Sequence, residues 1–402
     1  MRNVKKSLTS IPKKIFKGFV NKKNPTIPLR LLSSLKANKT ALFSYLSGPL
    51  SVPDNSTIFF GHSNKWKSKE IARILLDIGY NVDAIDFNEL NFVPEKKYDV
   101  IFDIAYNIYR FDRYLDSNTI KLLHMTGSYP TYQDVAETQR VQAANQRKKT
   151  NFIPRRINQY PDQVIASLEI ADSISLIGNE HTLSTYLEKY HKKIHLITTT
   201  ASYIEGLIKK RENYIPAERE YLWFFGSGAI HKGLDLVLDS FSVRTDLHLN
   251  VVGNIQKEKD FLEEYHNELY NLPNISYYGY LTPVSETFKQ VVKRTYCFIA
   301  PSCSEGISPA VATCLQIGLF PIISHDTGID LPPGCGIYLK TCNIDEILDA
   351  LDTVSHMSPI ELANQIHEIQ AYSLKQYSQE QFHKDMKNYL SNILLEGIGV
   401  TK

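Results

Sequence analysis

Residues 300–318 (APSCSEGISPAVATCLQIG) have the types and spacing of an anion-binding site. A polar loop with Glu305 and Gly306 follows an apolar run, and Ser308 and Pro309 then favour the start of a helix, as N-cap and first helical residue. A helix N-terminus has unpaired N–H groups and a partial positive charge, which together bind phosphate. Glu305 would repel a lone phosphate, but its carboxylate can accept hydrogen bonds from hydroxyl groups attached to that phosphate. The alternative is a solvated loop glutamate without a ligand.

Residues 224–236 (FFGSGAIHKGLDL) are a second candidate for binding phosphate. Gly226 and Gly228 follow an apolar run that predicts a strand, and glycines there let a ligand approach the backbone closely. Lys232 and Gly233 come at the expected start of the next helix, where the ammonium group can pair with phosphate oxygens. The spacing is not that of a Walker A loop. A Lys–Gly pair at a helix start is also a frequent surface feature without a ligand.

Two blocks of alternating strand and helix must position these loops. Such alternation predicts α/β domains, each with a parallel, doubly wound sheet, and a ligand site in the cleft between them. We expect strands of the first block at residues 57–61, 81–86, 99–104, 120–125, 173–177 and 194–198. The polar segment at residues 205–220 is predicted to be a linker between the two blocks.

The second block contains both candidate phosphate loops. We expect its strands at residues 221–225, 247–252, 275–278, 297–300 and 321–324. The helical patterns fall at residues 233–241, 257–270, 284–293, 309–317 and 344–354, and residues 359–395 predict terminal helices without a strand.

Together the two loops resemble the large family of retaining GT-B nucleotide-sugar glycosyltransferases, the glycosyl transferases group 1 type. The C-terminal half of that family has three sequence patterns in order. The first is G-R-x-x-x-x-K-G-x-D, the second is P-S-x-x-E-G with a second Glu eight positions after the first, and the third is G-x-P-V-I-x-S-x-x-x-G. The resemblance covers residues 221–330, and the matching positions are Gly226, Lys232, Gly233, Asp235, Pro301, Ser302, Glu305, Gly306, Gly318, Pro321, Ile323, Ser324 and Gly328.

The resemblance implies a GT-B fold, in which two Rossmann-like domains face a central cleft. The chain then divides into a basic N-terminal arm (1–53), an N-terminal acceptor domain (54–204), a C-terminal nucleotide-sugar-binding domain (217–358) and C-terminal helices (359–402). The implied reaction transfers a sugar from a nucleotide-diphosphate donor to a saccharide or lipid-linked acceptor, with retention of anomeric configuration, in surface polysaccharide or glycolipid synthesis.

The family's site residues transfer position by position. The lysine of K-G contacts the donor pyrophosphate and corresponds to Lys232, and the glutamate of E-G contacts the donor sugar and corresponds to Glu305. A histidine at the end of an N-domain strand often lies beside the transferred sugar, and His124 is the candidate; the alternative is a strand-end histidine with a structural partner. The implied catalytic residues are His124 and Glu305, and the implied donor-binding residues are Gly226, Ser227, Lys232, Gly233, Gly306, Ile307, Ser308 and Thr313.

Two positions depart from the family pattern. The arginine that binds pyrophosphate is Ser227 here, and the second glutamate, which pairs with the ribose hydroxyls, is Thr313. Losing a charged hydrogen bond costs about 1.5–3 kcal/mol, so another group must substitute or donor binding is weak. The nearby candidates for this substitution, unranked from the sequence, are His231, Arg155 and Arg156.

No D-x-D triplet occurs, and we therefore expect neither a metal ion nor a cofactor, the nucleotide sugar being a substrate. The five cysteines include no C-x-x-C pair, which favours free thiols in a reducing cytoplasm. No apolar run approaches the roughly 18 residues that a spanning helix needs.

Residues 1–53 contain eleven Lys or Arg and no Asp or Glu, so the net charge of +2 combines +11 in this segment with −9 in the rest. Ile15, Phe16, Phe19 and Val20 would share one face of a helix in this arm, a pattern typical of helices that lie on anionic membranes. We therefore expect a cytoplasmic protein that contacts the inner face of the membrane through residues 1–39. The alternative is a tail, or a helix packed on the protein itself. Nucleic acid is not expected, because its binding would need aromatic residues that stack on bases, and Phe16 and Phe19 fit one apolar helix face better.

Residues 145–156 (NQRKKTNFIPRR) are also basic. They suggest either a solvated face or a site for a phosphate-bearing acceptor. Ser227 and Thr313 also leave open a non-catalytic GT-B subunit that supports an active glycosyltransferase, and a GT-B epimerase is a further enzymatic alternative.

Overall fold

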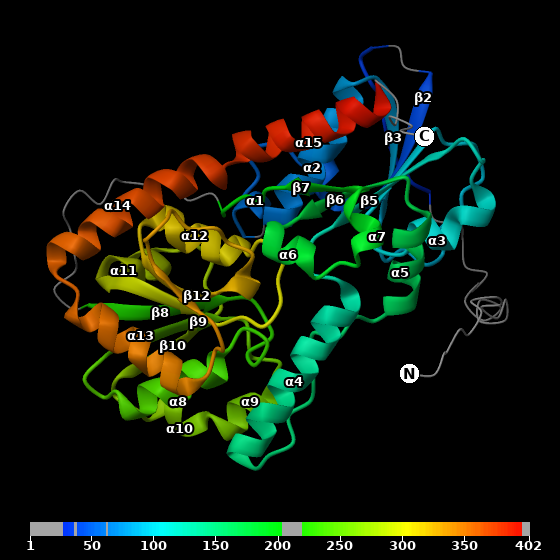
Figure 1. The fold of residues 1–402 in the computed structure, drawn as a ribbon. Helices are drawn as coiled ribbons and strands as arrows, with labels where there is room; N and C mark the ends of the chain where they lie inside the picture. The colour runs from blue at the N-terminus through cyan, green and yellow to red at the C-terminus, as the bar shows by residue number, and fades with distance from the viewer. Residues whose placement is uncertain (1–26, 36–37, 62, 203–218, 396–402) are drawn as a thin grey trace.

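A computed structural model describes residues 27–35, 38–61, 63–202 and 219–395 of the chain. These residues form two α/β domains, each built on a parallel sheet with helices packed against it (Figure 1). The N-terminal sheet has the strand order β1-β3-β2-β4-β5-β6-β7, and the C-terminal sheet has the order β10-β9-β8-β11-β12-β13. The predicted fold class is therefore confirmed.

The N-terminal sheet is parallel except for its edge strand β1, which pairs antiparallel with β3. Five of the six predicted strands are present, with bounds that agree to within one residue. The strands of this sheet are β1 (Leu29–Leu31), β2 (Lys39–Tyr45), β3 (Tyr80–Asp86), β4 (Val100–Asp103), β5 (Ile120–Met125), β6 (Ser173–Ile177) and β7 (Ile194–Ile197).

The sequence interpretation of residues 29–61 was wrong in two respects. The expected strand at 57–61 is instead the short helix α1 (Ile58–Gly61), which leads into α2 (Ser63–Asp77). The strand next to the centre of the sheet is β2, which lies within the segment interpreted as an arm. Ala41 to Tyr45 are all buried, but the basic composition around them concealed this strand. The amphipathic helix expected near residues 12–20 and the linker at 205–218 lie outside the described residues.

The remaining helices of the N-terminal domain are short, except for α4 (Pro130–Lys148). This helix has 19 residues, and it extends from the N-terminal domain along the C-terminal domain (Figure 1). Pro130 at its first turn favours its start, and Lys149 ends it in a left-handed conformation. The other helices are α3 (Asn107–Phe111), α5 (Pro161–Ile170), α6 (Glu180–Ser184) and α7 (Glu188–His191), with 3-10 turns η2 (Gly48–Ser51) and η3 (Asp112–Tyr114).

The C-terminal domain follows the prediction closely. All five predicted strands are present, and β13 extends the sheet beyond them. The helix expected over residues 257–270 is divided at Tyr265 into α9 (Lys259–Glu264) and α10 (His266–Tyr270). The strands are β8 (Glu220–Phe225), β9 (Leu249–Gly253), β10 (Ile275–Gly279), β11 (Thr295–Ala300), β12 (Phe320–Ser324) and β13 (Ile337–Leu339). The other helices are α8 (Leu234–Val243), α11 (Glu286–Arg294), α12 (Pro309–Ile317) and α13 (Ile344–His356), with the 3-10 turn η4 (His325–Thr327).

Two terminal helices return the chain to the N-terminal domain. The first, α14 (Pro359–Gln376), packs on α12, and the second, α15 (Gln379–Leu394), packs on α2 and β7 (Figure 1). Phe382 of α15 makes an edge-to-face ring contact with Trp66 of α2, at 5.9 Å between centroids. Within the described part of the chain, no helix is long and apolar enough to cross a membrane.

Candidate functional site

The loop that carries Glu305 lies between the two domains. It connects β11 to α12, and Gly306 contacts the carboxyl ends of two strands of the N-terminal sheet. A Cβ atom at Gly306 would lie 2.3 Å from the carbonyl oxygen of Ile177 and 2.7 Å from that of Thr126, so glycine is the residue that fits there. Ser128 Oγ donates a 2.7 Å hydrogen bond to the carbonyl oxygen of Glu305. The structure thus places the predicted Glu–Gly loop at the domain interface.

The loop from Gly226 to Gly233 connects β8 to α8 and is held by the buried carboxylate of Glu258. Its two oxygens accept hydrogen bonds from the N–H groups of Gly228 (2.7 Å) and Ala229 (3.0 Å). Gly228 and Gly233 have φ values of +94° and +70°, in the left-handed region that favours glycine. Sequence reasoning did not identify Glu258, because nothing in its local pattern marks it as a partner of this loop.

The two loops meet where Lys232 pairs with Glu305. Lys232 Nζ forms an ion pair with the Glu305 carboxylate, and the two side chains are only 7% and 14% exposed. Burial lowers the pKa of Lys232 well below its ordinary value, so its charged form depends on a close anion. Glu305 supplies that anion in this structure, and a diphosphate could replace it. Gly233 packs against Pro301 in the same region, which keeps the loops together.

The start of α12 offers backbone N–H groups beside this ion pair. Gly306 N–H and Ile307 N–H donate to no acceptor within the described residues, whereas Ser308 N–H donates to the carbonyl oxygen of Thr327 at 2.9 Å. The first turn of any helix also leaves its own N–H groups free of intrahelical acceptors. Two of the three predicted backbone donors are therefore available for an anion.

Thr313, at the position of the family's second glutamate, has a structural role. Its hydroxyl donates to the carbonyl oxygen of Pro309 at 2.7 Å and accepts from the N–H of Ser202 at 2.9 Å. The side chain is buried, and both of its hydrogen bonds are made with backbone groups of the protein. In this conformation Thr313 has no free donor for ribose hydroxyls.

His124 lies within the N-terminal domain and is fully buried. Its Nδ1 is 2.8 Å from Ser175 Oγ, and its ring packs near Tyr45 and Phe102, at 6.2 and 5.6 Å between centroids. Burial lowers the pKa of His124 to about 3, so the imidazole is neutral at ordinary pH. Its hydrogen bond and its ring contacts are with residues of the N-terminal domain, and its place beside a sugar stays a prediction.

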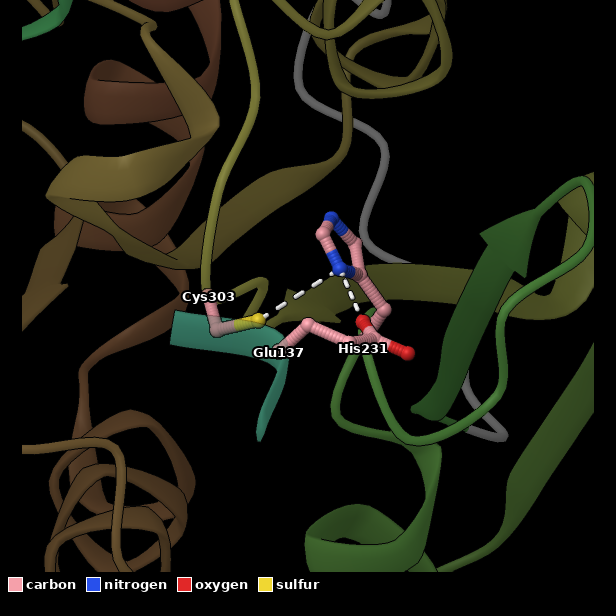
Figure 2. Close-up of side chains that lie close together, drawn as sticks. All are labelled: Glu137, His231 and Cys303. Atoms are coloured by element: carbon pink, nitrogen blue, oxygen red, sulfur yellow. Dashed lines mark hydrogen bonds and ion pairs between the residues drawn. The ribbon is translucent and has the colours of Figure 1, made fainter. Parts of the chain in front are cut away.

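A buried cluster of Glu137, His231 and Cys303 joins the domains beside Lys232 (Figure 2). His231 Nδ1 hydrogen-bonds to the carboxylate of Glu137 and lies 3.5 Å from Cys303 Sγ, and Nε2 lies 2.6 Å from the carbonyl oxygen of Ser304. That carbonyl can only accept, so Nε2 carries a proton. The cluster is therefore arranged as a hydrogen-bond network between the domains.

The basic residues 145–156 bind the C-terminal domain, so both interpretations offered from the sequence were wrong for most of them. Their charges meet carboxylates of α8, α9 and α10 across the interface. The ion pairs are Arg147–Asp235 (2.6 Å), Arg147–Asp239 (2.7 Å), Lys148–Asp239 (3.1 Å), Lys148–Glu268 (3.3 Å) and Arg155–Asp260. The sequence could not show this, because the partner carboxylates are remote in the chain.

The domain interface is closed around these residues. A cavity lined by Glu137, His231 and Glu258 has a volume of about 10 Å³, which is room for roughly one water molecule. A larger cavity of about 560 Å³ lies at the opposite, amino ends of the C-terminal strands, lined by residues that include His248 and Asn274. A diphosphate that binds Lys232 would have to displace Glu305 from the ion pair.

Comparison with known proteins gives a family match and a set of similar structures. The model of the family Glycosyl transferases group 1 matches residues 207–372. Among curated proteins, the sequence search found no match.

The similar structures span nearly the whole chain. Sucrose-phosphate synthase from Thermosynechococcus elongatus has a TM-score of 0.61 at 12% identity, over 89% of this chain and 100% of that one. HepE from Anabaena, in complex with UDP and glucose, has a TM-score of 0.54 at 12% identity, over 88% and 100%. The lipopolysaccharide outer core galactosyltransferase WaaB has a TM-score of 0.55 at 11% identity, over 88% and 99%. At such identities the shared feature is the two-domain fold.

Proposed function

We propose that this chain transfers a sugar from a nucleotide-diphosphate donor, because the model of the glycosyl transferases group 1 family matches its residues 207–372 and the chain has the GT-B fold. The acceptor in this proposal is a saccharide or a lipid-linked saccharide of surface polysaccharide or glycolipid synthesis. The observation that carries the proposal is the meeting of Lys232, Glu305 and the free N–H groups before α12 at the domain interface.

The similar structures support the class of donor. HepE is described with UDP and glucose, and WaaB is described as a galactosyltransferase. Both have a fold like that of this chain, and the loops that carry Lys232 and Glu305 are the ones that match the family pattern. A nucleotide-diphosphate donor therefore agrees with the site.

The proposed mechanism assigns a task to each group of this site. The Lys232 ammonium and the N–H groups of Gly306 and Ile307 stabilise the negative charge that develops on the leaving diphosphate. Glu305, released from its ion pair, accepts hydrogen bonds from hydroxyl groups of the donor sugar. The transfer proceeds with retention of configuration and without a metal ion in this proposal, since the charge stabilisation comes from the protein.

Thermal unfolding tests donor binding. Wild type and Lys232→Ala are heated with UDP, GDP, dTDP and CMP and with the corresponding nucleotide sugars. At 100 times its dissociation constant a ligand adds about 2.7 kcal/mol of stability, which raises Tm by several degrees for a protein of this size. We expect one nucleotide to stabilise wild type but not Lys232→Ala. Equal stabilisation of both proteins would place binding elsewhere, and stabilisation by none would contradict the proposal.

A non-catalytic GT-B subunit is the second candidate function. The observation that favours it is the hydroxyl of Thr313, which is engaged by Pro309 and Ser202. Such a subunit would bind a donor weakly and would not release the nucleotide. Assay of the isolated chain for donor hydrolysis or transfer distinguishes the two functions, because turnover excludes the second.

A further inference from the structure

Arg156 lies over the glycine loop that precedes Lys232. It belongs to the N-terminal domain, in the segment that follows α4, yet its side chain reaches the C-terminal domain. A Cβ atom at Gly228 would lie 3.0 Å from Arg156 Cγ and 3.1 Å from Cδ, so the aliphatic part of Arg156 covers this glycine. Burial lowers the pKa of Lys232 and of His231, and the positive charge of Arg156 lowers both further.

The neighbouring cations are already paired, whereas Arg156 is not. Arg155 forms an ion pair with Asp260, and His231 is enclosed by Glu137 and the carbonyl oxygen of Ser304. Arg156 is exposed, and its guanidinium has no hydrogen bond or ion pair with any residue that the structure describes. Of the three candidates that the sequence left unranked, it is the one with free donors.

The backbone of Arg156 is held in place although its guanidinium is free. Its N–H donates to Glu137 Oε1 at 3.2 Å, and its carbonyl oxygen accepts from Gln133 Nε2 at 2.6 Å. Glu137 is also the partner of His231 across the interface. One carboxylate therefore fixes both the loop of Arg156 and the residue that precedes Lys232.

We propose that Arg156 and Lys232 together bind the diphosphate of the donor, Arg156 from one domain and Lys232 from the other. This inference rests on the proposed function. It names Arg156 as the residue that replaces the family's pyrophosphate-binding arginine, whose position is occupied here by Ser227. A guanidinium offers paired N–H donors that match phosphate oxygens, and an ammonium adds a point charge. Because the two cations come from different domains, a bound diphosphate would contact both domains.

The test compares Arg156→Ala with Arg155→Ala as a matched control. Both variants lose an arginine at adjacent positions, but only the first loses the free guanidinium over Gly228. Binding of UDP, GDP and dTDP is measured by calorimetry for both variants, for wild type and for Lys232→Ala. Loss of one charge-assisted interaction of this kind corresponds to about 10- to 100-fold weaker binding. We expect that loss for Arg156→Ala, a smaller loss for Arg156→Lys, and binding within about threefold of wild type for Arg155→Ala.

The outcomes separate the inference from the function on which it depends. If wild type binds a nucleotide, Lys232→Ala does not, and Arg156→Ala binds like Arg155→Ala, the inference is wrong and the donor site stands. If wild type binds none of the three nucleotides, the proposed function is contradicted, and so is the inference that Arg156 binds the donor diphosphate. Apo Tm values of the two arginine variants close to that of wild type confirm that the variants are folded, since both side chains are exposed.

Discussion

At the scale of residues, the site depends on glycines that let two backbones touch. Gly306 lies against the carbonyl oxygens of Ile177 and Thr126 in the other domain. Glycine has no side chain to separate them, so the free N–H groups before α12 can face the interface. The family pattern located this residue, but its contact with the N-terminal sheet could be seen only in the structure.

Gly306→Ala should destabilise the closed molecule. The added methyl group would overlap two backbone carbonyl oxygens, which cannot rotate away as a side chain could, so the domains or the loop must shift. Overpacking of this kind costs about 1–3 kcal/mol, measured by urea unfolding. Gly226→Ala is the control, because nothing lies within 4 Å of the added atom. Equal stability of the two variants would contradict the close contact.

At the scale of elements, α4 and α15 decide how the two domains are joined. The cationic end of α4 and the segment after it pair with carboxylates of α8, α9 and α10, and α15 returns to pack on α2. On the opposite side of the interface, α6 pairs with η4 through His181 and Asp326, 3.1 Å apart, and Tyr132 also donates to Asp326 at 2.7 Å.

The His181–Asp326 pair should make the stability of the closed form depend on pH. The hydrogen bond to Asp326, with the charges of Asp326 and Asp330, raises the pKa of His181 above its ordinary value near 6.5. The folded state therefore binds this proton more tightly than the unfolded state does. The stabilisation is complete below about pH 6.5 and is lost as pH rises through the raised pKa.

The measurement compares Tm at pH 6 and pH 8 for wild type and His181→Gln. We expect the fall in Tm between these pH values to be smaller in the variant, because it lacks the group that titrates. An unchanged fall would show that the pair contributes nothing to stability. His181 is 37% exposed, so solvent screening keeps the effect small.

The sequence predicted most strands and the glycine loops because these depend on local patterns. Strand β2 was missed because its basic surroundings resemble a tail, although its last five residues are buried. The engagement of Thr313 by Ser202 and the position of Arg156 over Gly228 join residues far apart in the chain. Such contacts follow from how the domains pack, and no spacing in a single sequence encodes them.

At the scale of the whole molecule, the structure is a closed form of the proposed enzyme. Lys232 and Glu305 satisfy each other, and the nearby cavity holds little more than one water molecule. A donor diphosphate that binds Lys232 therefore has to take the place of Glu305. We propose that the basic N-terminal segment also acts at this scale, by directing the protein to an anionic membrane surface.

Deletion of residues 1–26 tests the membrane proposal without disturbing the sheet. The deletion must end before β1 and β2, because these strands belong to the N-terminal domain. The segment 1–26 carries eight of the basic residues and no acidic one, so we expect wild type to sediment with vesicles that contain anionic lipid and the deletion variant to stay in the supernatant. Vesicles of neutral lipid are the control. Equal sedimentation of both proteins would contradict the membrane proposal.

The central claim is that Lys232 and Glu305 form the two halves of one donor site, for diphosphate and for sugar. Calorimetry of the preferred nucleoside diphosphate and of its nucleotide sugar, with wild type, Lys232→Ala and Glu305→Gln, tests this most directly. We predict that Lys232→Ala weakens both ligands, whereas Glu305→Gln weakens the nucleotide sugar alone and leaves the bare diphosphate at least as tightly bound, because Lys232 is released from its ion pair. Binding of both ligands that neither substitution changes would contradict the claim.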